Sequence, residues 1–90
     1  MADYVLTQKR RLFIRSVGHS TINALLDGLL EDQVISQEEM CKVKDENNTV
    51  MDKARVLIDL IIGKGQHACQ VFIDYLLAED PQLSLKMELK

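Results

Sequence analysis

The chain has 90 residues, 28% of them charged and 47% hydrophobic, and its net charge at neutral pH is −3. This composition is typical of one globular domain, here expected to span residues 1–90, with a core that needs no disulfide framework. The negative net charge argues against general nucleic-acid binding. The apolar runs are far shorter than the roughly 18 residues that cross a membrane. With two cysteines and no recognisable signal peptide, the expected location is the cytoplasm.

Apolar residues at helical spacing predict an all-α protein, and the first helix is expected over residues 3–17, before Gly18. Its inward-facing residues are Leu6, Phe13, Ile14 and Val17. Arg10 falls within the same apolar arc. Either its side chain snorkels to the surface, or the helix bends between Thr7 and Arg10.

The second predicted helix begins at Ser20, a residue type that often caps helix N-termini. Its apolar residues recur at i, i+3, i+4, i+7 and i+8, the spacing of a buried stripe. They are Ile22, Leu25, Leu26, Leu29 and Leu30. Gly28 interrupts this helix at a cost of about 1 kcal/mol relative to alanine.

Four further helices are predicted, over residues 36–44, 49–63, 66–79 and 81–89. Ser36 and Glu39 match the capping-box pattern at the start of the third helix. Thr49 caps the fourth helix, and Pro81 suits the first turn of the sixth. The fifth helix is apolar almost all round, so we expect it in the middle of an antiparallel six-helix bundle.

Charge is divided along the chain into a basic and an acidic segment. Residues 9–15 carry four positive charges and no negative one, whereas residues 27–39 carry five negative charges and no positive one. Such a domain can dock head-to-tail, basic end against acidic end, on a related domain or on a second copy of itself. The alternative is a solvated surface in which Asp52, Arg55 and Asp59 pair along their own helix. The segregation of the two signs favours the interface.

The sequence around Cys69, His67-Ala68-Cys69-Gln70-Val71, partly matches the nucleophile motif Q-A-C-[RQG]-G of caspases. The first and last positions differ, and Cys69 lies in an apolar helical stretch where a thiol usually packs without reacting. No sheet is predicted that could hold a catalytic dyad with the upstream His19. We therefore expect no enzymatic activity.

Metal and nucleic-acid sites are not predicted either. The cysteines and histidines lack the paired spacing of zinc ligands, so no cofactor is expected. The basic segment could contact phosphate. The helix that follows it, however, presents Asp27 and Glu31, which repel DNA.

Four segments resemble the caspase recruitment domain (CARD) family, and the resemblance extends over the whole chain. They are KRRLFIRS at 9–16, GHSTINALLDGLL at 18–30, VISQEEM at 34–40 and TVMDKARVLID at 49–59. The chain is most similar to the CARD of caspase-1 and to CARD-only proteins, and residues 79–83 look more like the latter. The resemblance implies a six-helix death-fold bundle with a kinked first helix.

The resemblance also implies CARD–CARD binding through two charged faces. The basic face comprises Arg10, Arg11, Arg15 and Arg55. The acidic face comprises Asp27, Glu31, Asp32, Glu38 and Glu39. Gly28 departs from the pattern of caspase prodomains, which commonly have an acidic residue there, and this weakens the acidic face.

The partner that the resemblance implies is the CARD of caspase-1 or of a related adaptor, with self-association as a further expectation. If 90 residues are the whole protein, it would occupy CARD sites without bringing a protease, and so act as a decoy inhibitor in inflammasome signalling. The alternative is the prodomain of a caspase-1-like cysteine protease, which would mediate that protease's recruitment and activation.

Overall fold

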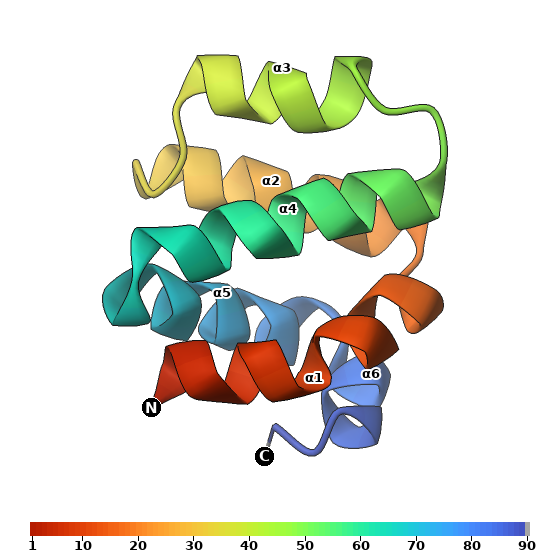
Figure 1. The fold of residues 1–90 in the computed structure, drawn as a ribbon, viewed down its shortest axis with the longest axis vertical. Coiled ribbons are helices and arrows are strands. Elements are labelled where there is room, and N and C mark those ends of the chain that lie inside the picture. The colour runs from red at the N-terminus through yellow and green to blue at the C-terminus, as the bar shows by residue number, and fades with distance from the viewer. Residues whose placement is uncertain (90) are drawn as a thin grey trace.

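Six α-helices form the protein, and no strand occurs among residues 1–89, the part of the chain that the computed structural model describes. The helices are α1 (Ala2–Ser16), α2 (His19–Glu31), α3 (Gln37–Asp45), α4 (Val50–Lys64), α5 (Gln66–Glu79) and α6 (Pro81–Lys86). Figure 1 shows α3 across one end of the bundle, and α1 and α6 at the other end. The all-α prediction is confirmed.

Helix α5 occupies the centre of the bundle, as its apolar sequence predicts. It packs against α1, α2, α4 and α6. The Phe72 ring of α5 meets the Phe13 ring of α1 edge-on, with 5.4 Å between the ring centroids. From α2, the side chains of Leu25, Leu26 and Leu29 are fully buried. The predicted stripe of α2 is therefore part of the core, which holds the other helices in fixed positions.

Of the two explanations that the sequence offers for Arg10, the outward course of its side chain is confirmed, and a bend between Thr7 and Arg10 stays a prediction. The helical backbone of α1 is continuous from Ala2 to Ser16, and Figure 1 shows its axis bending along its length. Leu6, Phe13 and Ile14 are buried against the bundle. The Arg10 side chain runs outward and stays 38% exposed, so that its guanidinium reaches α4.

Side-chain caps begin α3 and α4 as predicted. The Ser36 hydroxyl accepts a hydrogen bond from the backbone N–H of Glu39, and the Glu39 carboxylate accepts one from the N–H of Ser36, which completes the capping box. The Thr49 hydroxyl accepts from the N–H of Asp52. The predicted cap at Ser20 is wrong, because α2 begins at His19 and its N-cap is Gly18, two residues before Ser20.

The end of α6 also differs from the prediction. The helix ends at Lys86, and the chain then closes a Schellman motif in which Glu88 has a φ of +59°. Its two hydrogen bonds run from Leu89 N–H to Ser84 O and from Glu88 N–H to Leu85 O. Helix α2 ends in the same way with Gln33 at a φ of +61°. Neither position is a glycine, so composition gives no signal for these stops.

Candidate protein-interaction surface

The basic face lies on two helices that pack against each other, α1 and α4. Arg11 and Arg15 are one turn apart on α1, and both are exposed. Neither of them forms an ion pair with a carboxylate of residues 1–89. These two guanidinium groups are therefore available to a carboxylate of another molecule.

The other two arginines of the basic face are already paired within the domain. Nε and Nη2 of Arg10 donate to the two carboxylate oxygens of Asp59, at 2.6 and 2.9 Å. Nη1 of Arg55 donates to Oδ1 of Asp52 at 2.8 Å, the i, i+3 pairing that the sequence suggests. The hydrogen bond from Arg10 lowers the pKa of Asp59, and burial partly opposes this shift. Each of these two arginines is therefore held by an aspartate of its own domain.

The acidic face begins on the exposed side of α2. Asp27 and Glu31 are one turn apart there, opposite the buried leucines, and Glu38 is exposed in the first turn of α3. None of these three carboxylates forms an ion pair within residues 1–89. They are the acidic counterpart of Arg11 and Arg15.

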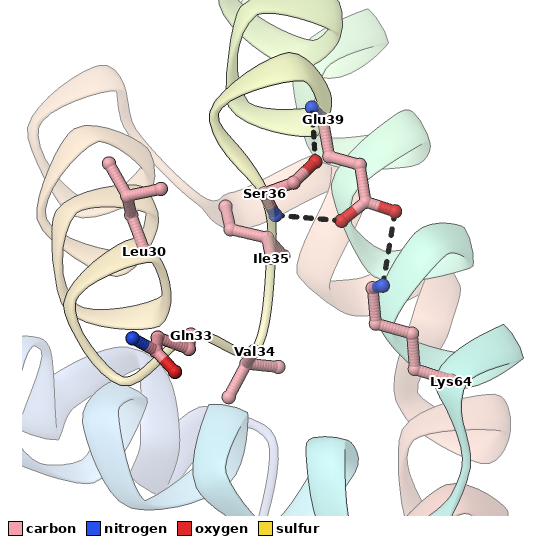
Figure 2. A pocket seen from close by; sticks show the side chains of 7 residues that line it. All are labelled: Leu30, Gln33, Val34, Ile35, Ser36, Glu39 and Lys64. Carbon is pink, nitrogen blue, oxygen red and sulfur yellow. Dashed lines mark hydrogen bonds and ion pairs between the residues drawn. The ribbon is translucent and has the colours of Figure 1, made fainter.

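Glu39 has a structural role that limits its part in the acidic face. Figure 2 shows its carboxylate between the backbone N–H of Ser36 and the ammonium of Lys64, which lies 3.0 Å away. The hydrogen bond from Ser36, followed by the contacts with Lys64, lowers the pKa of Glu39. These three residues also line an open pocket of about 580 Å³ beside the segment that joins α2 to α3. The Glu39 carboxylate thus fastens α3 to the end of α4.

Asp32 is also engaged, in this case by an aromatic residue. The Tyr75 hydroxyl of α5 donates to Oδ2 of Asp32 at 2.7 Å, and this hydrogen bond raises the pKa of Tyr75 to about 12. The Tyr75 ring lies against Gly28, where a Cβ atom would be only 2.6 Å from Cε1 of the ring. The glycine that removes an acidic side chain from this face therefore also makes room for the ring.

Cys69 lies inside the core, as predicted. Its side chain is fully buried, and its thiol donates to the carbonyl oxygen of Ile61 at 3.5 Å. Burial raises the pKa of the thiol, and the charge of Asp3 adds to this shift. His19 is exposed on α2. A buried, protonated thiol is a poor nucleophile, so the partial caspase motif has no chemical consequence here.

Among residues 1–89, His, Cys, Asp and Glu side chains form no group of three or more that could hold a metal ion. None of the described helices has the length and apolar character needed to span a membrane.

Helices α1 and α4, which carry the basic face, pack against each other, and so do α2 and α3, which carry the acidic face. Three partners of these faces were missed from the sequence: Asp59 for Arg10, Lys64 for Glu39 and Tyr75 for Asp32. Helical spacing identifies the pair of Arg55 with Asp52 because it is local. The other three pairs join different helices and leave no local signal.

Comparisons with known proteins agree with this architecture. The model of the family described as "Caspase recruitment domain" matches residues 3–90. Human caspase recruitment domain-containing protein 18 is 68% identical over 89 residues, which cover 99% of each chain. Horse (Equus caballus) caspase-1 is 62% identical over 99% of this chain, but the chain spans only 22% of that protein's length.

A solved structure shares the fold. The solution structure of ICEBERG, described as an inhibitor of interleukin-1beta generation, has a TM-score of 0.87 and 68% identity, and the match covers 94% of this chain and 96% of that one. This likeness confirms a six-helix bundle of the death-fold type. Residues 3–90 correspond to a CARD, a domain for CARD–CARD interaction that is not itself catalytic. The chain therefore belongs to the caspase recruitment domain family.

Proposed function

We propose that residues 1–90 act as a single CARD that binds the CARD of caspase-1 in the cytoplasm and inhibits recruitment of the protease as a decoy. The observation that carries this proposal is the similarity to caspase recruitment domain-containing protein 18 over 99% of both chains. It is supported by the 68% identity to ICEBERG, whose description names it an inhibitor of interleukin-1beta generation.

The charged faces supply a mechanism for this binding. Among residues 1–89, Arg11 and Arg15 of α1 have no carboxylate partner, and Asp27 and Glu31 of α2 have no cationic partner. A partner CARD with the same polarity can dock its acidic face on the first pair or its basic face on the second. The same two contacts would also join copies of this chain head-to-tail.

The prodomain of a caspase-1-like protease is the second candidate. It is favoured by the 62% identity to horse caspase-1 over 99% of this chain, although the chain spans only 22% of that protein. Reading the natural transcript beyond Lys90 distinguishes the two candidates. A continuation into a protease with an intact Q-A-C-x-G loop would replace the decoy by a prodomain.

Charge reversal tests the interaction. Arg15→Glu and Asp27→Lys should each weaken binding to purified caspase-1 CARD, by about 2–5 kcal/mol where the charge becomes buried at the interface. Their matched controls are Lys44→Glu on α3 and Asp74→Lys on α5, exposed residues outside both faces. Titration calorimetry measures affinity, and thermal melting checks that each variant is folded.

Rescue makes the test specific. The loss caused by Arg15→Glu should be partly restored by an Asp→Lys change on the acidic face of the partner. Rising salt should slow association, because exposed charges are screened over roughly 8–10 Å at physiological ionic strength. If both reversals bind as tightly as the wild type, the faces are only a solvated surface and the proposed mechanism is wrong.

A further inference from the structure

Arg10 binds a carboxylate of its own domain in the way that it would be expected to bind a carboxylate of a partner. Its guanidinium binds the Asp59 carboxylate through two parallel hydrogen bonds, at 2.6 and 2.9 Å. This fork geometry is the usual way in which arginine binds a carboxylate between proteins. The side chains of Arg10 and Asp59 are 38% and 50% exposed, so the pair lies at the surface, where a partner can reach it.

A second ion pair, with one hydrogen bond, lies within α4 itself. Arg55 follows Asp52 by three residues and precedes Asp59 by four, so the three side chains lie along one exposed side of the helix. Arg55 donates to Asp52, and its charge also helps to lower the pKa of Asp59. Together with Arg10, these groups form a cluster of two cations and two anions with no net charge.

The neutral cluster divides the basic face into two unequal parts. Arg11 and Arg15 have no ion-pair partner among residues 1–89, whereas Arg10 and Arg55 are compensated within the domain. A partner carboxylate gains a new ion pair at Arg11 or Arg15. At Arg10 it must first displace Asp59, and the exchange of one exposed ion pair for another changes the free energy little.

We propose that Asp59 occupies Arg10 in place of the carboxylate of an acidic partner face, and that it thereby lowers the affinity of the basic face for such a partner. Asp52 acts in the same way on Arg55. This inference rests on the proposed function, because it assumes that a partner CARD docks on the basic face.

Asparagine substitution removes the competing charge and keeps the shape of the side chain. Asp59→Asn should bind purified caspase-1 CARD about 1.5- to 5-fold more tightly than the wild type, the ratio that corresponds to one exposed ion pair. Asp52→Asn/Asp59→Asn should bind more tightly still. The matched control is Asp74→Asn on α5. It removes the same charge from a carboxylate that accepts a hydrogen bond from the Gln70 side chain, and it should leave the affinity unchanged.

Arginine substitutions give a second measurement, and the comparison of Arg10→Gln with Arg11→Gln does not depend on the folding of the aspartate variants. Arg10→Gln should weaken binding less than Arg11→Gln does, because Arg10 is already paired. In the Asp59→Asn background, Arg10→Gln should abolish the gain in affinity. Titration calorimetry at 50 and 150 mM salt reports all of these effects.

The outcomes separate this inference from the proposed function. If Arg15→Glu loses binding while Asp59→Asn binds no more tightly than the wild type, the partner docks on the basic face but Asp59 does not compete, and the inference is overturned. If Arg15→Glu binds like the wild type, the docking itself is wrong. Equal losses for Arg10→Gln and Arg11→Gln would also overturn the inference.

Discussion

Gly28→Ala is a sharp test of the contact between α2 and α5, because two effects of the added methyl group oppose each other. In an exposed helix, alanine in place of glycine stabilises by about 1 kcal/mol. Here the new Cβ atom would lie 2.6 Å from Cε1 and 2.8 Å from Cδ1 and Cζ of Tyr75, distances at which atoms overlap. The ring must therefore move, and the hydrogen bond from its hydroxyl to Asp32 restrains that movement.

The magnitudes decide the expected sign. Overpacking in a well-packed contact costs about 1–3 kcal/mol. Set against the gain in helix propensity, Gly28→Ala should change the free energy of unfolding by about 0 to 2 kcal/mol in the destabilising direction. In a Tyr75→Ala background the clash is absent, and the same substitution should stabilise by about 1 kcal/mol. The two positions should thus be coupled by at least about 1 kcal/mol.

A double-mutant cycle measures this coupling directly. Urea unfolding of the wild type, Gly28→Ala, Tyr75→Ala and the double variant gives the four free energies. Gly63→Ala is the matched control, because a Cβ atom at Gly63 would meet no atom within 4 Å. If Gly28→Ala changes the free energy of unfolding equally with and without the Tyr75 ring, the packing of the ring does not require a glycine at position 28.

Four further predictions concern the core and the charged residues. Leu26→Ala should lower the free energy of unfolding by about 2–5 kcal/mol because Leu26 is fully buried, and an unchanged thermal melt would contradict this. Cys69 should react slowly with a thiol reagent in the folded state and quickly in denaturant, while the exposed Cys41 should react quickly in both. The pKa of Glu39 is lowered in the folded state, so its carboxylate contributes stability that is fully present above the ordinary glutamate pKa of about 4.3. This stability is lost as the pH falls from there through the folded-state pKa, and Glu39→Gln should reduce the loss in thermal melts at acid pH. Glu31→Gln should raise the melting temperature of the isolated domain and weaken its binding to caspase-1 CARD. If this variant is more stable but binds as tightly as the wild type, Glu31 lies outside the interface.

The sequence was most informative where the signal lies within one or two helical turns. The buried stripe of α2, the capping box of Ser36 and Glu39 and the cap at Thr49 all depend on residues three or four positions apart. The stops of α2 and α6 were not predictable in this way, because Gln33 and Glu88 adopt a conformation that usually indicates glycine. At the start of α2, Gly18 takes the N-cap position that the more favourable Ser20 was expected to occupy.

For the charged faces, the sequence predicted which side chains are exposed better than it predicted which of them lack a partner within the domain. All the arginines that it assigns to the basic face reach the surface, but Arg10 pairs with a residue 49 positions away. Asp32 pairs with Tyr75, which is 43 positions away. Such pairs depend on how the helices pack, and a single sequence does not record which exposed charges are compensated across the bundle.

The charges that have no ion-pair partner among residues 1–89 include two pairs of like charges that destabilise the isolated domain. Arg11 and Arg15 repel each other across one helical turn, as do Asp27 and Glu31, and each such pair destabilises a helix by about 0.2–0.5 kcal/mol. Glu31 ends α2, whose last turn has no basic residue, so its charge also opposes the helix dipole. An opposite charge on a partner would relieve both kinds of repulsion. Arg10 and Arg55 are each paired with an aspartate within the domain, whereas the like charges on α1 and on α2 repel each other. This arrangement is expected of a domain whose charged faces are completed by another domain of the same polarity.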